Sequence, residues 1–212
     1  MKRRNFLKYL INTPLILEIL KNNLWAEILS SNLEAKLLIA YNEINSKFKL
    51  NNEEPALIVD GKNQRLYFVD GYNGIRIHRE YEISTARKGF GNKLESNKTP
   101  IGIHRIKEKI GSDALSGTVF SSRINTGRIA KPNSGGFYSA QDCITSRIMW
   151  LEGCEKQNQT TYSRFIYIHG VPDEKLIKHP SSRGCILMKD KDIIELYDII
   201  SSGTYVNIKE HI

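Results

Sequence analysis

The 212-residue chain is poor in cysteine and lacks long hydrophobic segments. It contains three Cys, and no run approaches the roughly 18 to 20 apolar residues of a transmembrane helix. No internal repeat or low-complexity tract is visible. The length fits one domain of about 150 residues plus an N-terminal extension, and it leaves no room for a second catalytic domain.

The chain also lacks a concentrated basic surface in its main part. The formal net charge is +8, and residues 1–26 contribute +4 of it through Lys2, Arg3, Arg4, Lys8 and Lys21 against Glu18. The remaining +4 is scattered, and no basic platform flanked by aromatic residues recurs, which argues against nucleic acid as a partner. A modest positive charge is compatible with an anionic polymer partner and equally with ordinary solubility.

Residues 1–26 are predicted to be an export signal. Arg3-Arg4-x-Phe6-Leu7-Lys8 resembles the twin-arginine export motif, an apolar segment runs from Tyr9 to Leu20, and Leu24-Trp25-Ala26 is a possible cleavage site. Glu18 interrupts the apolar segment, and Leu24 is not a small residue. General secretion therefore remains an alternative, as does an amphipathic helix that packs on the domain or on a membrane. Export predicts a periplasmic location.

Residues 27–54 are predicted to form an amphipathic helix and a linker. Ser31-x-x-Glu34 has the form of a capping box. Apolar residues then recur every three or four positions, at Leu33, Leu37, Tyr41, Ile44 and Phe48. We expect this apolar stripe to pack on the domain that follows.

Residues 55–212 are predicted to form one mainly β domain, a sandwich or partly closed barrel with a few peripheral helices. Apolar and polar residues alternate around Leu66 and Phe68 and again around Ile75 and Ile77, between turns rich in Gly, Asp and Asn. The segments 85–99 and 110–146 show little regular pattern and are expected to be loops that wall a cleft. Ile144 to Leu151 fits a helix or a strand. Near the end, Asp190 is expected to cap a helix whose Ile193, Ile194, Tyr197 and Ile200 face the core, before a last strand from Thr204 to Ile208.

Cys185 and His169 form the most informative pair in the chain. His169 ends the strand-like run Arg164 to Gly170, and Cys185 follows sixteen residues later. A thiol becomes a strong nucleophile when a base can take its proton, and a His at the end of a rigid strand can do so. Gly184 allows a tight turn and could leave main-chain N–H groups free for a developing oxyanion. Taken alone, a free Cys is more often a small buried hydrophobe and a lone His more often structural.

Strand alternation predicts which of these side chains share a face. In the first strand, His169 lies with Phe165 and Tyr167, opposite Ile166 and Ile168. After the nucleophile, Cys185 and Leu187 share one face, while Ile186 and Met188 point into the core.

The residues around the pair resemble the signature of the L,D-transpeptidase (YkuD-like) family. His169-Gly170, a loop, Ser182-Arg183-Gly184-Cys185-Ile186-x-Met188 and a helix with an acidic start follow the family pattern. Ala56–Asp60 with Asn63–Val69 resembles its opening hairpin, Tyr81–Thr85 its next strand, and Lys98–His104 its Thr-Pro-x-Gly turn. The resemblance covers roughly Pro55 to Ile208.

The resemblance implies roles for the site residues. Cys185 would be the nucleophile and His169 the general base, and the carbonyl of Gly170, rather than Asp173 or Glu174, would orient the imidazole. Gly184 completes the implied catalytic group. Arg183, Ser182 and Tyr167 are predicted to bind substrate. For Ser182 the hydroxyl is expected to brace the loop by backbone hydrogen bonds, and Arg183 could instead be a solvated loop charge.

Leu187 is the main departure from the family pattern, which normally has Arg at this position. An Arg beside the thiol could stabilise a thiolate or pair with a substrate carboxylate, and Leu can do neither. Either Arg183 covers that function, or activity and acceptor choice are altered.

The function that the resemblance implies is acyl transfer on peptidoglycan stem peptides, without a cofactor. Cys185 would attack a tetrapeptide stem at the bond before the terminal D-Ala, and an amine of a neighbouring stem would then form a 3→3 cross-link. Water as acceptor would make the protein an L,D-carboxypeptidase, and an envelope-protein lysine would make it an anchoring enzyme. A non-catalytic wall-binding module and a general Cys-His protease are the rival classes.

Cys143 and Cys154 are the remaining cysteines. A catalytic thiol must stay free, so Cys143 with Cys154 is the only disulfide compatible with activity. A zinc site is not favoured, because Cys154, His169, His179 and Cys185 lack the short paired spacings of structural zinc ligands.

Overall fold

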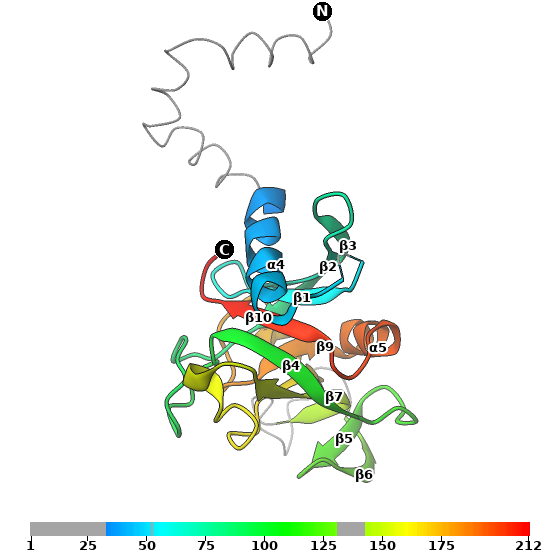
Figure 1. The fold of residues 1–212 in the computed structure, drawn as a ribbon. Coiled ribbons are helices and arrows are strands. Elements are labelled where there is room, and N and C mark those ends of the chain that lie inside the picture. The colour runs from blue at the N-terminus through cyan, green and yellow to red at the C-terminus, as the bar shows by residue number, and fades with distance from the viewer. Residues whose placement is uncertain (1–32, 52, 131–142) are drawn as a thin grey trace, which may run out of the picture.

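A computed structural model describes residues 33–51, 53–130 and 143–212 of the chain. Ten strands and two α-helices form this part (Figure 1). The strands are β1 (Ala56–Asp60), β2 (Arg65–Asp70), β3 (Arg76–Ser84), β4 (Gly102–Ile110), β5 (Thr118–Ser121), β6 (Ile124–Ile129), β7 (Ile144–Gly153), β8 (Tyr167–Val171), β9 (Ile186–Lys189) and β10 (Tyr205–Lys209). The helices are α4 (Leu33–Phe48) and α5 (Asp190–Ile199), with short 3₁₀ turns at Lys156–Asn158 and Glu174–Leu176. The expected mainly β fold is confirmed.

The strands form one sheet whose pairings close into a ring. The order is β4-β10-β1-β2-β3-β9-β8-β7-β5-β6, and an additional pairing of β4 with β7 joins the ends of the eight-stranded part. Two pairs are parallel, β1 with β10 and β8 with β9, and the others are antiparallel. The β5–β6 hairpin is attached to β7 outside this ring. Of the two expected architectures, the closed pairing corresponds to the barrel.

The ring encloses the main hydrophobic core. Side chains from most of its strands and from α5 meet there, including Leu57, Leu66, Ile106, Ile168, Ile186 and Ile193. Each such aliphatic side chain contributes about 1.5–3 kcal/mol when it is fully buried. In β8 and β9 the core residues are Ile166 just before the strand, Ile168, Ile186 and Met188, as strand alternation predicts.

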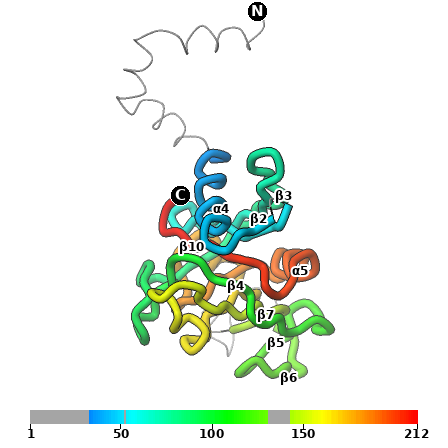
Figure 2. The backbone as a smooth tube through the Cα atoms, in the orientation of Figure 1, coloured from blue at the N-terminus to red at the C-terminus, as the bar shows by residue number. Residues whose placement is uncertain are grey.

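Helix α4 packs on the outside of the sheet, at the end opposite to the β5–β6 hairpin (Figure 2). Its buried residues Leu37, Ala40, Tyr41 and Ile44 form a second core with β1, β2 and β4 residues. The side chain of Asn207 on β10 donates to the carbonyl oxygen of Ala40 at 2.9 Å and so fixes the helix on the sheet. The helix expected within residues 27–54, and its packing on the domain, are therefore confirmed.

The structure differs from, or decides between, four local expectations. The segment 110–146 is not loop throughout, because it contains the β5–β6 hairpin and the start of β7. The stretch from Ile144 belongs to a strand rather than a helix. Asp190 does not cap α5: the cap is Lys189, and the Asp190 carboxylate instead accepts hydrogen bonds from the hydroxyls of Thr145 and Ser146, both at 2.6 Å. Ile194 was expected to face the core but is only half-buried, and Leu196 is buried on α5 instead.

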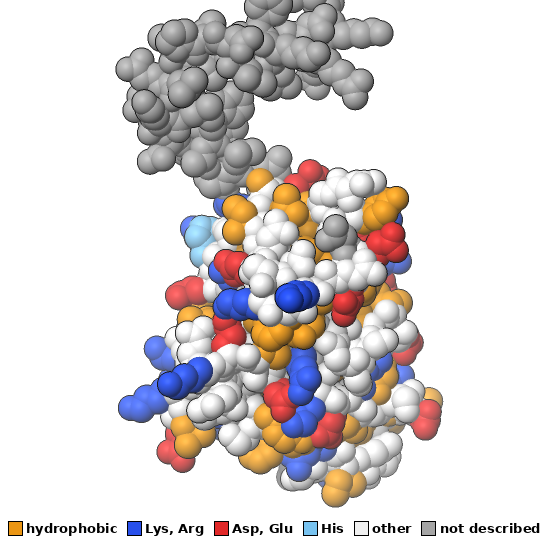
Figure 3. Space-filling view, in the orientation of Figure 1, with side chains coloured by type: hydrophobic (Ala, Val, Ile, Leu, Met, Phe, Trp, Pro, Cys, Tyr) orange, Lys and Arg blue, Asp and Glu red, His pale blue; other side chains and the backbone are white. Residues whose placement is uncertain are grey.

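The charged side chains are mixed on the face drawn in Figure 3, where Lys and Arg lie among Asp and Glu rather than gathering in one patch. Within the described residues, neither the length nor the hydropathy of any helix suffices to cross a membrane. The predicted export signal in residues 1–26 lies outside the described residues.

Candidate active site

The parallel pairing of β8 with β9 brings His169 and Cys185 into one cavity. Ile168 pairs with Ile186 and His169 with Leu187, so Cys185 stands directly before the paired segment of β9. The cavity has a volume of about 300 Å³ and is lined by Asn97, Ile144, Phe165, Tyr167, His169, Ser182, Arg183, Cys185 and Leu187. The face shared by Phe165, Tyr167 and His169 and the face shared by Cys185 and Leu187 therefore both point into it.

The loop that carries Cys185 is fixed by backbone hydrogen bonds to the segment after β3. The N–H groups of Ser181 and Ser182 donate to the carbonyl oxygen of Thr85 at 2.9 and 3.0 Å, and Arg87 N–H donates to the Ser182 carbonyl oxygen at 3.1 Å. The Ser182 hydroxyl donates to the Cys185 carbonyl oxygen at 2.6 Å. Ser182 thus braces the turn as expected, and its hydroxyl is already engaged although the residue lines the cavity.

Gly184 gives the loop its tight turn. Its φ of +133° favours glycine, and a Cβ here would lie 2.9 Å from Ile166 Cδ1. Its own N–H donates to the Ser182 hydroxyl at 3.2 Å. Gly184 is therefore required for the conformation and close packing of the loop, and an oxyanion site formed by main-chain N–H groups at this turn stays a prediction.

A backbone carbonyl holds the imidazole of His169, as the family resemblance implied. His169 Nδ1 lies 2.9 Å from the carbonyl oxygen of Gly170. A carbonyl oxygen only accepts, so Nδ1 carries the proton and Nε2 has the lone pair in the neutral ring. Gly170 itself is tightly packed, since a Cβ would lie 2.4 Å from Asp190 Oδ1. The ring is thereby presented in the tautomer that a general base needs.

Burial keeps both members of the pair uncharged. It lowers the pKa of His169 to about 4, partly offset by the bond to Gly170, and the side chain is 4% exposed. Burial likewise raises the pKa of the Cys185 thiol to about 11. A backbone hydrogen bond from Tyr167 and the positive charges of Arg164 and Arg183 lower this pKa, but by less than burial raises it. The thiol donates to the Phe165 carbonyl oxygen at 3.6 Å. At neutral pH the pair is therefore a thiol and a neutral imidazole in the same cavity.

This state predicts a weakly reactive thiol in the absence of substrate. Alkylation of Cys185 by iodoacetamide should rise about tenfold per pH unit between about pH 7 and about pH 10, because the rate follows the small thiolate fraction. The rate can be measured by mass spectrometry of the peptide that contains Cys185. A plateau between about pH 6 and about pH 8 would instead reveal a preformed thiolate-imidazolium pair.

Arg164 is a cation near the thiol that the sequence did not single out. Its guanidinium donates to the carbonyl oxygens of Gly91 (3.2 Å) and Lys98 and to the Ser96 hydroxyl (3.3 Å). It lowers the pKa of Cys185, and burial lowers its own. Arg164 thus fixes the loop between β3 and β4 while it favours the thiolate.

Leu187 forms an apolar floor where the family normally has Arg. It is 1% exposed and packs with Val171 and Ile177, beside the partly buried Leu176 and Cys185. The side chains packed against Leu187 are therefore apolar, and the residue also lines the cavity.

Replacing Leu187 with Arg should destabilise the protein. A guanidinium forced into this cluster loses its hydration without gaining a partner, so we expect the free energy of unfolding to fall by about 2–4 kcal/mol. Leu187→Met is the matched control and should cost less than about 1.5 kcal/mol. Urea unfolding would measure both. Equal stability of Leu187→Arg and the parent protein would show that the side chain can turn into the cavity.

In the described part of the chain, the other cysteines form no disulfide and no metal site is present. All three thiols are free, so the disulfide considered between Cys143 and Cys154 is not formed. Burial raises the pKa of both, to about 11 for Cys154. Within residues 33–51, 53–130 and 143–212, no three His, Cys, Asp or Glu side chains are grouped to hold a metal ion.

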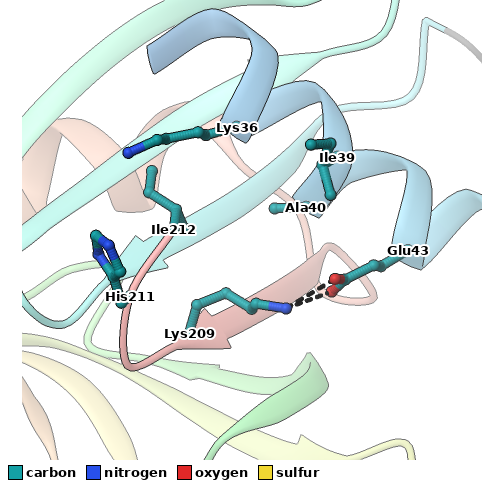
Figure 4. Close-up of a pocket in the computed structure, with 7 residues that line it drawn as sticks. All are labelled: Lys36, Ile39, Ala40, Glu43, Lys209, His211 and Ile212. Atoms are coloured by element: carbon teal, nitrogen blue, oxygen red, sulfur yellow. Dashed lines mark hydrogen bonds and ion pairs between the residues drawn. The ribbon is translucent and has the colours of Figure 1, made fainter. Parts of the chain in front are cut away.

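A second cavity, of about 360 Å³, lies between α4 and the C-terminal residues (Figure 4). It is lined by Lys36, Ile39, Ala40, Glu43, Lys209, His211 and Ile212. Lys209 Nζ donates to both Glu43 oxygens, at 2.7 and 2.9 Å. The lining contains no thiol, and this lysine is paired.

Comparison with known proteins identifies the family. The model of the YkuD family, the L,D-transpeptidase catalytic domain, matches residues 54–208. No curated protein matches the sequence at a significant level.

Solved structures resemble the chain only distantly. An L,D-transpeptidase from Xylanimonas cellulosilytica is 15% identical with a TM-score of 0.46, over 75% of this chain and 62% of that one. An L,D-transpeptidase from Mycobacterium smegmatis is 16% identical with a TM-score of 0.47, over 74% and 58%. One from Enterococcus faecium is 16% identical with a TM-score of 0.42, over 74% and 50%. The aligned part thus spans 50 to 62% of the length of these chains.

Proposed function

Because the chain belongs to the YkuD family of L,D-transpeptidase catalytic domains, we propose that it is a peptidoglycan acyltransferase with Cys185 as nucleophile. The observation that carries this proposal is the cavity shared by a thiol and a neutral imidazole on adjacent parallel strands. The Gly170 carbonyl fixes the imidazole as a proton acceptor. A wall-binding module would need neither group, and this weighs against the non-catalytic alternative.

The proposed first step is acylation of Cys185 by a tetrapeptide stem. The sulfur attacks the carbonyl carbon of the third residue, and the thiol proton passes to Nε2 of His169. The tetrahedral intermediate then collapses, the C–N bond to D-Ala breaks, and the imidazolium returns the proton to the leaving amine. A thioester and free D-Ala result, and no cofactor takes part.

The proposed second step is attack on the thioester carbonyl carbon by a side-chain amine of another stem. The C–S bond breaks, and the amine proton passes through His169 to the leaving thiolate, so that the Cys185 thiol is regenerated and a 3→3 cross-link results. The lining near the thiol includes the apolar side chains Ile144, Phe165 and Leu187. His169 lines the same cavity and can take a proton from an amine or from water, so the preference for transpeptidation rests on the family and product analysis decides between the two acceptors. We place the reaction in the periplasm, in line with the export signal predicted in residues 1–26.

Product analysis tests the proposed acceptor. The purified protein is incubated with disaccharide-tetrapeptide, and the muropeptides are separated and weighed. Cross-linked dimers that have lost one D-Ala support transpeptidation, whereas tripeptide monomers alone would identify an L,D-carboxypeptidase. Unchanged tetrapeptide would contradict both and favour a binding module.

A further inference from the structure

The tip of the β5–β6 hairpin has an unusual backbone for its sequence. Ser121 pairs with Ile124, so Ser122 and Arg123 form a two-residue turn, and their φ angles are +48° and +70°. Two positive φ angles define a type I′ turn, in which Asn and Gly are the preferred residues. Ser and Arg adopt it here at a steric cost, which indicates that contacts of the Arg123 side chain compensate.

The Arg123 side chain extends from this turn onto a group of aromatic rings. Its guanidinium carbon lies 4.6 Å from the centre of the Trp150 ring and 5.3 Å from that of Phe165. Nη1 donates to the hydroxyl of Tyr167 at 3.2 Å. Cation–π contacts and this hydrogen bond orient the guanidinium.

The same rings border the cavity at Cys185. Phe165 and Tyr167 both line it, and the Tyr167 ring meets the His169 ring edge-on at 6.4 Å. Phe165 is 51% exposed and has a φ of +56°, while its carbonyl oxygen accepts the thiol hydrogen bond. The carbonyl oxygen of Phe165 therefore contacts the Cys185 thiol, while the ring of Phe165 contacts Arg123.

Arg123 lies beside this rim with donors left for a ligand, and Arg183, which lines the cavity itself, is the other cation there. Arg164 donates hydrogen bonds to two carbonyl oxygens and a hydroxyl of the loop between β3 and β4. Leu187 carries no charge. In the described part of the chain, the Tyr167 hydroxyl is the hydrogen-bond partner of Arg123, and a guanidinium has five N–H groups. A planar, oriented guanidinium is suited to bidentate binding of a carboxylate.

We propose that Arg123 binds a carboxylate of the peptide stem at the rim of the Cys185 cavity and so selects acidic stems over amidated ones. This inference rests on the proposed function, because that function supplies the ligand class. Arg123 positions the stem and takes no part in bond making. The charge that the family normally has two residues after its nucleophile is thereby provided from a different element.

Binding to a non-reacting protein tests this role. Cys185→Ala removes acylation, and calorimetry then measures the Kd of a tetrapeptide stem with free carboxylates and of the same stem with its carboxylates amidated. With Arg123 present, the acidic stem should bind about 10-fold to 100-fold more tightly. Adding Arg123→Gln should abolish this preference by weakening the acidic stem alone, and Arg123→Lys should keep part of it, since Lys binds as a point charge.

Two further variants make the test specific. Arg79→Gln is the matched control, because Arg79 pairs with Glu195 between β3 and α5 and contributes nothing to the cavity. It should leave both Kd values unchanged. The proposal fails if the preference survives Arg123→Gln, if Arg183→Gln removes it instead, or if neither stem binds while Arg123 is present. If the preference is confirmed but the parent protein forms no acyl-enzyme, the proposed function fails and the binding role of Arg123 stands.

Discussion

Replacing Cys185 with Ala is expected to lower consumption of a tetrapeptide stem at least about 10⁴-fold. The sulfur is the atom that forms the proposed thioester, and no other side chain that lines the cavity is a comparable nucleophile. The Ser182 hydroxyl cannot substitute, because it donates to the Cys185 carbonyl oxygen and accepts from Gly184. Release of D-Ala provides the assay.

Cysteine variants elsewhere are the controls for this result. Cys154→Ala should retain activity, because Cys154 packs in the core under α4 and does not line the cavity. Activity that survives Cys185→Ala but is lost with Cys154→Ala would contradict the assignment of the nucleophile.

Replacing His169 with Gln is expected to slow acylation about 10²-fold to 10⁴-fold, the usual contribution of a general base. The protonated thiol, whose pKa is about 11 in the resting site, then has no acceptor for its proton. Gln keeps a polar group near the Gly170 carbonyl, so the fold should persist. Single-turnover kinetics at about pH 7 measures the acylation step, and raising the pH should partly rescue the variant by supplying thiolate.

His104 offers a matched control for that variant. It is fully buried like His169, has its pKa lowered to about 4 by burial, and bonds to the Gly102 carbonyl and the Thr161 hydroxyl away from the cavity. His104→Gln should lower stability without changing the acylation rate of the folded protein. Equal slowing by both substitutions would show that burial of a histidine, and not its position beside Cys185, explains the loss.

The sequence predicts the site residues on the strands well, for a physical reason. Alternation along a strand is a local property, so the shared face of Tyr167 and His169 and that of Cys185 and Leu187 follow once two strands are recognised. The structure adds what local pattern does not contain, namely that β8 and β9 are neighbours and parallel. The roles of these residues remain proposals that the experiments above address.

Sequence patterns did not predict the contacts that loop residues make. The hairpin that carries Arg123 was expected to be loop, because β6 is exposed along its length and its turn lacks the usual Asn-Gly. The bond from the Gly184 N–H to the Ser182 hydroxyl is visible only in the folded turn. Asp190 was expected to cap α5, and tertiary contacts with Thr145 and Ser146 hold its carboxylate instead.

The account centres on a covalent thioester at Cys185, and intact-protein mass spectrometry during turnover tests it most directly. The protein is mixed with disaccharide-tetrapeptide, quenched in acid and weighed, and the modified peptide is then sequenced. The account predicts an adduct equal to the donor without its terminal D-Ala, located on Cys185 and absent from Cys185→Ala. An adduct on Cys143 or Cys154, or consumption of donor with no adduct at any quench time, would contradict it.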